Sequence, residues 1–186
     1  MIISKSILKK QLKHTSKDQT KPSIMGILIN GNKTVATDGY RLSIIEYPKG
    51  IDCKAFMSNN LIKDILKSKF KKAEIKANPE LDCIEIDSTS SSVIISWHYS
   101  EGKTTTSLSI NDANIFPPYE QCIPKDLERK NETIGLNTRM LGDLIAEDFN
   151  NLVSFEFYGA LNPIIARSTV EGLKVTNVLM PIRLPS

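Results

Sequence analysis

A short pattern occurs three times along the chain and constrains its fold more than any other feature. In each copy an apolar residue precedes Ser or Asn, and an apolar pair and a further apolar residue follow at fixed offsets. The copies span residues 3–12, 57–66 and 136–145. Ser and Asn side chains cap helices by accepting a hydrogen bond from the first turn, and an apolar stripe buries one helix face. The pattern therefore predicts three short amphipathic helices.

Strand-like runs flank each predicted helix in the same order. A short strand precedes each helix, at residues 1–3, 55–57 and 133–136. Further strands are expected at 24–29, 33–37 and 42–47, then at 73–76, 83–87, 92–98 and 105–110, and finally at 153–158, 164–168 and 173–181. Polar turns, often containing Gly, separate several of these runs. This order indicates an α+β fold of three β-α-β-β-β units with antiparallel sheets; accidental similarity of short helices is the alternative.

Basic residues gather on the first two predicted helices. The net charge of only +3 does not by itself require a polyanionic partner. The lysines expected on the polar faces are Lys5, Lys9, Lys10 and Lys13, and then Lys63, Lys67, Lys69, Lys71 and Lys72. Lysines four positions apart share a helix face and slightly weaken an isolated helix. Two interpretations stay open: a solvated helix surface, or sequence-independent contact with phosphates.

The sequence offers no convincing catalytic or cofactor-binding motif. His14 and His98 have no Cys or carboxylate at metal-ligand spacing, and the Gly-rich nucleotide-binding signatures and GxSxG are missing. No apolar run approaches the ~20 residues of a membrane span. We therefore expect a cytoplasmic protein that is not an enzyme, with no metal, no cofactor and no membrane partner; an enzyme built on this scaffold is the least favoured reading.

Four segments, in order, carry a resemblance to a known family. Residues 35–43, VATDGYRLS, are similar to the ATDGHRL segment of bacterial sliding clamps, the β subunit of DNA polymerase III. Residues 116–119, FPPY, resemble the family's FPDY, and 135–137, GLN, resemble its GFN. Residues 178–184, VLMPIRL, resemble the terminal MPMRL or MPVRL. The resemblance implies a DNA-clamp fold.

The resemblance covers only part of a family clamp. Residues 1–124 resemble the whole middle domain, with units at 1–52 and 53–115 followed by a linker rich in proline and charge that runs to about residue 131. Residues 125–186 resemble the second half of the C-terminal domain. The expected molecule is therefore about one and a half clamp domains long, which agrees with the three units.

The resemblance also implies a peptide-binding pocket between these two parts. One wall would contain Ile24, Thr37, Gly39, Tyr40, Arg41, Leu42, Pro117 and Cys122. The other would contain Asn137, Met140, Leu161, Pro163, Met180, Pro181, Ile182 and Arg183. An apolar groove with a few polar groups suits an extended peptide with Leu and Phe anchors. The alternative is that residues 180–182 are simply a core strand. Tyr40 replaces the family's usual His, and Met140 replaces an aromatic residue.

The function implied by the resemblance is that of a DNA replication processivity factor. It would tether a DNA polymerase or other proteins with clamp-binding peptides to double-stranded DNA, with a clamp loader as a further partner, as a homo-oligomer. Lys5, Lys9, Lys10, Lys13, Lys63, Lys67 and Lys71 would face the phosphates. The alternative is a non-encircling adaptor or decoy, of a phage or plasmid, that binds clamp-interacting peptides.

Overall fold

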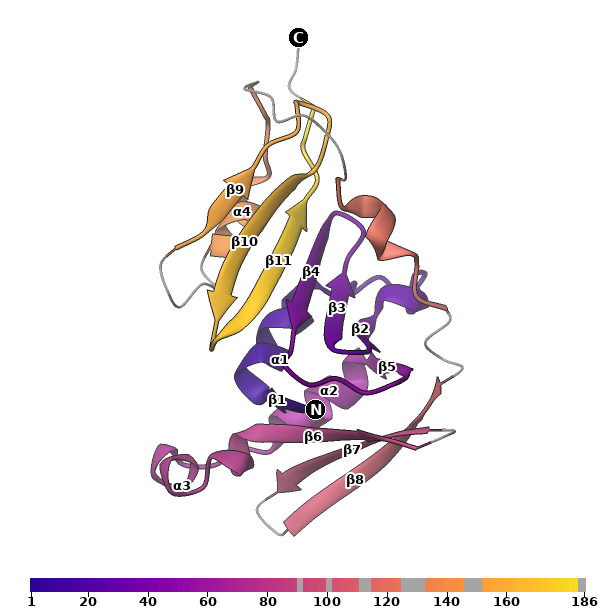
Figure 1. Cartoon of the computed structure of the whole chain (residues 1–186), viewed down its shortest axis with the longest axis vertical. Coiled ribbons are helices and arrows are strands. Elements are labelled where there is room, and N and C mark those ends of the chain that lie inside the picture. Colours follow the sequence, from indigo (N-terminus) through magenta and orange to yellow (C-terminus); the bar gives the residue numbers. More distant parts are fainter. Residues whose placement is uncertain (90–91, 100–101, 111–114, 125–132, 146–151, 184–186) are drawn as a thin grey trace.

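The computed structural model describes residues 1–89, 92–99, 102–110, 115–124, 133–145 and 152–183 (Figure 1). These residues form two antiparallel sheets and a few short helices, so the predicted α+β class is confirmed. The linker predicted beyond residue 124, to about 131, and Leu184 of the C-terminal motif lie outside the described residues.

The first sheet has four strands in the order β1-β6-β7-β8. Its strands are β1 (Ile2–Ser4), β6 (Cys83–Ser88), β7 (Ser92–Tyr99) and β8 (Gly102–Ser109). β7 alternates between buried and half-buried positions because one face of the sheet covers the core. β1 comes from the first unit but pairs with β6 of the second, with Ile3 opposite Ile84.

The second sheet has seven strands in the order β5-β2-β3-β4-β11-β10-β9. Its first four strands are β5 (Lys54–Ser58), β2 (Gly26–Asn30), β3 (Lys33–Thr37) and β4 (Arg41–Glu46). β5 belongs to the second unit but pairs with β2 of the first, with Leu28 opposite Phe56. The first two units therefore exchange their leading strands, and each sheet contains strands from both.

The third unit extends the same seven-stranded sheet. Its strands are β9 (Ser154–Glu156), β10 (Ile164–Val170) and β11 (Leu173–Leu179). β11 pairs with β4, with Val178 opposite Leu42 (Figure 1). Of the predicted leading strand 133–136, only Gly135 pairs, in an isolated bridge with Ile182.

The three predicted helices form and are capped as expected. They are α1 (Lys5–Gln11), α2 (Asn59–Lys67) and α4 (Thr138–Ile145), and single 3-10 turns occur at η1 (Leu12–His14), η2 (Pro22–Ile24), η3 (Pro79–Asp82) and η5 (Tyr119–Cys122). Ser4 Oγ accepts from the Ile7 N–H and Ser58 Oγ from the Leu61 N–H, both at 3.3 Å. Asn137 Oδ1 accepts from two N–H groups of α4.

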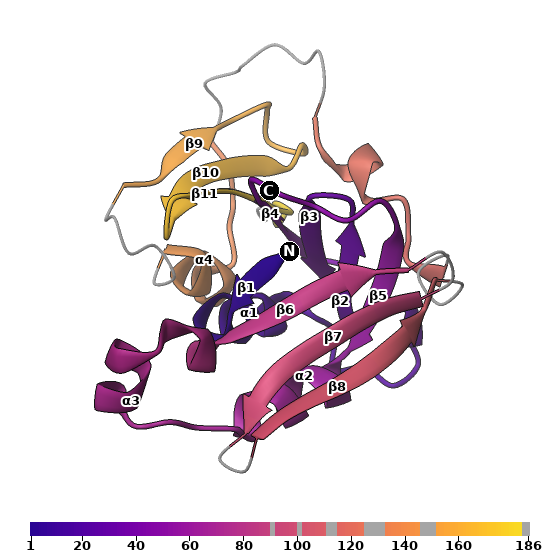
Figure 2. The ribbon, with the colours of Figure 1, turned by 60° about the horizontal axis from the view of Figure 1, so that its bottom comes forward.

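Both faces of the seven-stranded sheet are covered near its centre. On one face α1 and α2 fill the space between the two sheets, with Ile7, Ile62 and Ile65 in the largest apolar cluster; Figure 2 shows α2 behind β7. On the opposite face Leu42 and Phe116 belong to a second cluster. Strands buried on both faces read as nearly continuous apolar runs, which explains the Ile- and Leu-rich β2 and β4.

One predicted strand is wrong. Residues 73–76 are expected to be extended, but they lie in helix α3 (Lys72–Ala77). The Glu74 carboxylate accepts a hydrogen bond from the Lys71 N–H at 2.6 Å, a contact that favours a helix start. Ala, Glu and Lys are strong helix formers, and the short apolar alternation of Ala73 and Ile75 could not outweigh that propensity.

Candidate functional site

The turn between β3 and β4 is held by its own side chains. The Asp38 carboxylate accepts hydrogen bonds from the N–H groups of Tyr40 and Arg41, each at 3.0 Å. Thr37 Oγ1 accepts from the Gly39 N–H at 3.1 Å and donates to the Arg41 carbonyl at 2.8 Å. Gly39 has a φ of 92°, which residues with a Cβ rarely adopt. These contacts fix the turn while the Tyr40 side chain stays exposed.

Residues from opposite ends of the chain meet where this turn leaves the sheet. Arg41 lies opposite Leu179 in the β4–β11 pair. One position further, the Met180 N–H donates to the Tyr40 carbonyl at 3.0 Å. The two segments predicted as opposing walls of a pocket are therefore joined by a backbone hydrogen bond.

Four large apolar side chains at these strand ends are exposed. Tyr40 is 59% exposed, Leu161 67%, Met180 42% and Ile182 47%. Leu161 lies just before β10, whose first residue, Ile164, is opposite Leu179. We call Tyr40, Leu161, Met180 and Ile182 the junction surface. Exposed apolar residues that cluster in this way are typical of an interaction site rather than of a core strand.

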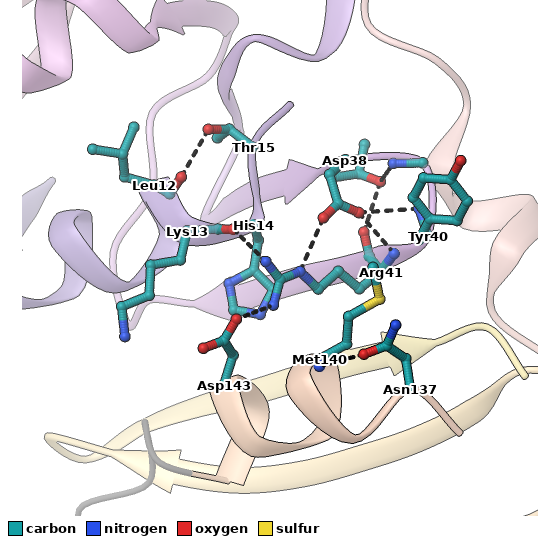
Figure 3. A network of polar contacts seen from close by, with 12 residues as sticks. Leu12, Lys13, His14, Thr15, Asp38, Tyr40, Arg41, Asn137, Met140 and Asp143 are labelled. Atoms are coloured by element: carbon teal, nitrogen blue, oxygen red, sulfur yellow. Dashed lines mark hydrogen bonds and ion pairs between the residues drawn. The ribbon is translucent and has the colours of Figure 1, made fainter. Parts of the chain in front are cut away.

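Arg41 contacts three separate parts of the protein. Its Nε donates to Asp38 Oδ2 and one terminal nitrogen donates to Asp143 Oδ2 of α4, both at 3.0 Å. The other terminal nitrogen donates to the Lys13 carbonyl at 2.7 Å (Figure 3). The Arg41 side chain is only 10% exposed. Its guanidinium therefore fastens the turn to η1 and to α4, behind the junction surface.

His14 is buried beside this ion-pair network and is 1% exposed. Burial, and then the nearby Arg41 charge, lower the pKa of His14 to about 4. The hydrogen bond from Arg41 holds the pKa of the Asp143 carboxyl below its usual range. At neutral pH the imidazole is therefore uncharged, and two carboxylates face the Arg41 cation.

The predicted pocket residues differ in how far their side chains are exposed to solvent. Gly39, Tyr40, Pro117, Cys122, Leu161, Met180, Ile182 and Arg183 are exposed, and Thr37, Arg41, Asn137, Met140, Pro163 and Pro181 are partly exposed. Ile24 and Leu42 are 7% and 4% exposed and pack in the second apolar cluster with Phe116. The prediction that Ile24 and Leu42 line a wall is therefore corrected, because they support the turn from inside the protein.

A polar hollow of about 630 Å³ adjoins the junction surface. Four predicted pocket residues line it: Tyr40, Arg41, Asn137 and Met140. Its lining also includes Lys13, Lys17, Lys21 and Arg139, together with Asp18, Asp38 and Asp143. The sequence pattern did not assign Lys17 or Lys21 to this site, since only the folded chain brings the segment after η1 against α4.

The predicted DNA-facing lysines do not all share one surface. Lys5 is 5% exposed, and its Nζ donates to the Ser68 hydroxyl at 2.7 Å and to the Leu81 carbonyl at 3.0 Å. The prediction that Lys5 faces DNA is therefore wrong, because its ammonium is buried and hydrogen-bonded. Lys9, Lys13, Lys63, Lys67 and Lys71 are exposed and Lys10 is partly exposed. Lys67 forms an ion pair with Asp64 at 2.6 Å.

Two kinds of site are not found among the described residues. No three His, Cys, Asp or Glu side chains in these ranges lie close enough to hold a metal ion. No helix in the described part of the chain is long and apolar enough to span a membrane.

Two strand-exchanged units surround a pair of helices, and a third unit continues one of their sheets. This is the fold of the bacterial sliding clamps, the β subunits of DNA polymerase III. The predicted clamp fold is confirmed.

Several solved structures of sliding clamps share the fold of this chain. The β sliding clamp of Caulobacter crescentus matches with a TM-score of 0.71 and 16% identity, over 99% of this chain and 65% of that one. The Bartonella birtlesii clamp bound to griselimycin matches with a TM-score of 0.68 and 19% identity, over 99% and 66%. The Thermotoga maritima β subunit matches with a TM-score of 0.67 and 14% identity, over 100% and 65%. This chain thus spans about 65% of the length of these clamps. No family model and no curated protein matches its sequence.

Proposed function

We propose that this chain is a non-catalytic, clamp-like protein that tethers partner proteins to DNA by binding their extended peptides at the junction surface. The observation that carries the proposal is the hydrogen bond between the Met180 N–H and the Tyr40 carbonyl, with exposed apolar side chains on both segments. A surface built by both ends of the chain has no evident role in packing, since its large side chains remain in solvent.

The chemistry of the junction surface suits an apolar peptide. Tyr and Met are enriched at protein interfaces, and the flexible Met side chain adapts to differently shaped anchors. Tyr40 adds a phenol that can donate or accept a hydrogen bond at the edge of the bound segment. A peptide with Leu and Phe anchors would cover the exposed area of Leu161, Met180 and Ile182 and remove it from water.

The peptide site is tested by direct binding. A labelled peptide with Leu and Phe anchors is titrated with the wild type, and then with Met180→Ala, by fluorescence anisotropy. We expect Met180→Ala to weaken binding about tenfold, because a buried Met side chain contributes roughly 1.5 kcal/mol or more. Leu152→Ala is the matched control, because Leu152 is also exposed but lies outside the junction surface. Equal binding by the wild type and Met180→Ala would refute the site.

The DNA part of the proposal depends on the exposed lysines. Lys9, Lys13, Lys63 and Lys71 offer phosphate contacts without base recognition, so retention on DNA should fall steeply as salt rises. A chain that encircles DNA would be retained on circular duplex DNA and released when that DNA is linearised. Light scattering would show the closed assembly that encirclement needs; a strict monomer at high concentration would exclude a ring.

A second candidate is an adaptor or decoy that binds clamp-interacting peptides and never encircles DNA. The buried Lys5 and the Lys67–Asp64 ion pair favour it, because both reduce the positive charge available to phosphates. This candidate keeps the peptide binding and its Met180 dependence. It predicts equal, weak retention on circular and linear DNA.

A further inference from the structure

The polar hollow is continuous with the junction surface. Tyr40 belongs to the junction surface and also lines the hollow, and Tyr40 is bonded to Met180 through its carbonyl. Met140 of α4 lines the hollow from the opposite side (Figure 3). A peptide that covers Tyr40 would therefore place its neighbouring residues at or inside the hollow.

The charges that line the hollow do not cancel. Arg41 already contacts both Asp38 and Asp143, so these two carboxylates are engaged by one buried cation. The remaining carboxylate, Asp18, accepts two hydrogen bonds from Thr20 and lies 4.0 Å from Lys21.

Basic side chains remain at the rim after this pairing. Lys17 and Arg139 are both exposed and line the hollow from two different elements, the segment after η1 and helix α4. Within the described ranges, no side-chain hydrogen bond engages either of them. Lys13 also lines the hollow, and its charge and that of Arg139 both act on the Asp143 carboxylate. The hollow therefore presents an excess of positive charge directly beside an apolar surface.

We propose that the hollow accepts acidic side chains that flank the apolar anchors of a peptide bound at the junction surface. The inference rests on the proposed peptide-binding function and specifies the partner: an apolar peptide with Asp or Glu next to its anchors. Lys17 and Arg139 act as the specificity-determining cations, because charged groups across an interface select partners and orientation.

Charge complementarity together with the apolar surface favours an acidic peptide over nucleic acid. A duplex backbone brings a dense row of phosphates and no apolar anchor for Leu161, Met180 or Ile182. The positive charge of the hollow would attract phosphates as well, but only a peptide supplies both a carboxylate for Lys17 or Arg139 and an apolar anchor for the junction surface.

Three peptides with the same Leu and Phe anchors test the inference. One has Glu residues before the anchors, one has them after, and one has Gln at both places. At low salt we expect at least one Glu peptide to bind about three- to tenfold more tightly than the Gln peptide, with the advantage shrinking as salt screens the charges. The double variant Lys17→Ala/Arg139→Ala should abolish the advantage, so that it binds the Glu and Gln peptides with equal affinity. Lys54→Ala on β5 is the control and should retain the advantage.

The outcomes separate the two proposals. If all three peptides bind equally and binding still depends on Met180, the acidic preference is overturned and the peptide site stands. If no peptide binds the wild type, both are overturned. If the double variant keeps the Glu advantage but loses retention on duplex DNA, the hollow is a phosphate-contacting surface and the inference is also overturned.

Discussion

At the scale of single residues, Arg41 connects parts of the protein that are far apart in sequence. It joins a β-turn, the end of η1 and helix α4 through contacts of 2.7–3.0 Å. Its neighbour Tyr40 remains in solvent on the same turn. The two residues therefore have different roles: Arg41 holds the turn in place, and Tyr40 extends from the turn into solvent.

Substitution Arg41→Ala should lower the free energy of unfolding by about 2 kcal/mol, because it removes charge-assisted hydrogen bonds and leaves Asp38 without its cation. Urea denaturation measures the loss. Lys33→Ala is the matched control, since the Lys33–Glu46 ion pair is about 40% exposed on both sides and should be worth less than about 1 kcal/mol. Equal losses in the two variants would show that the Arg41 contacts are not structural.

His14 should make stability fall in mild acid. Its pKa is about 4 in the folded state against 6.5 ordinarily, so the unfolded chain binds the proton more readily. Stability is complete above pH 6.5 and declines toward pH 4, by about 3 kcal/mol in all. Arg41, Asp38 and Asp143 are the charged groups that act on His14, and the lowered pKa of Asp143 extends the decline into stronger acid.

Denaturation of wild type and His14→Gln across this pH range tests the assignment. The variant should lack the decline between pH 6.5 and 4 and keep the part at lower pH. Parallel profiles for the two proteins would assign the decline to other groups.

At the scale of elements, the sequence predicted the features that depend on neighbouring residues, such as the positions of the helix caps. Ser4, Ser58 and Asn137 cap their helices as expected, because capping involves neighbours in the sequence. The exchange of β1 and β5, the burial of Lys5 and the partners of Arg41 depend on residues distant in sequence. The spacing of lysines four residues apart on α1 does not show that Lys5, rather than Lys9, is covered by the segments that contain Ser68 and Leu81. The resemblance predicted that the turn at Tyr40 and the segment at Met180 lie together, and their hydrogen bond shows that they do, but it did not predict how deeply Ile24 and Leu42 are buried.

Helix α1 offers a direct comparison of a buried and an exposed lysine. Lys5→Ala should destabilise the protein by about 1–3 kcal/mol, because the Ser68 hydroxyl and Leu81 carbonyl lose their buried donor. Lys9→Ala should change stability by less than about 0.5 kcal/mol, since Lys9 is exposed. Thermal unfolding distinguishes them. A similar melting temperature for both variants would contradict the buried role of Lys5.

At the scale of the whole molecule, one sheet joins the third unit to the first. β4 has β3 on one side and β11 on the other, so neither of its edges is free. A chain ending at residue 124 would leave the β4 edge unpaired and uncover Val178's apolar partners in the second cluster. We expect this fragment to form larger and less uniform assemblies than the intact chain does at equal concentration, as measured by light scattering. A fragment with the same association state and stability as the whole chain would show that the third unit is an independent attachment.

The pairing of β4 with β11 also affects when binding becomes possible during synthesis. Contacts between residues far apart in sequence form slowly, because the entropy of closing a long loop is lost before the contacts contribute any stabilisation. All strands and helices of the first two units have been synthesised once β8 is complete, but the Met180–Tyr40 hydrogen bond cannot form until residue 180 has emerged. A nascent chain that has not yet reached residue 180 would therefore lack half of the junction surface, so that partner peptides could bind only after this residue has been synthesised.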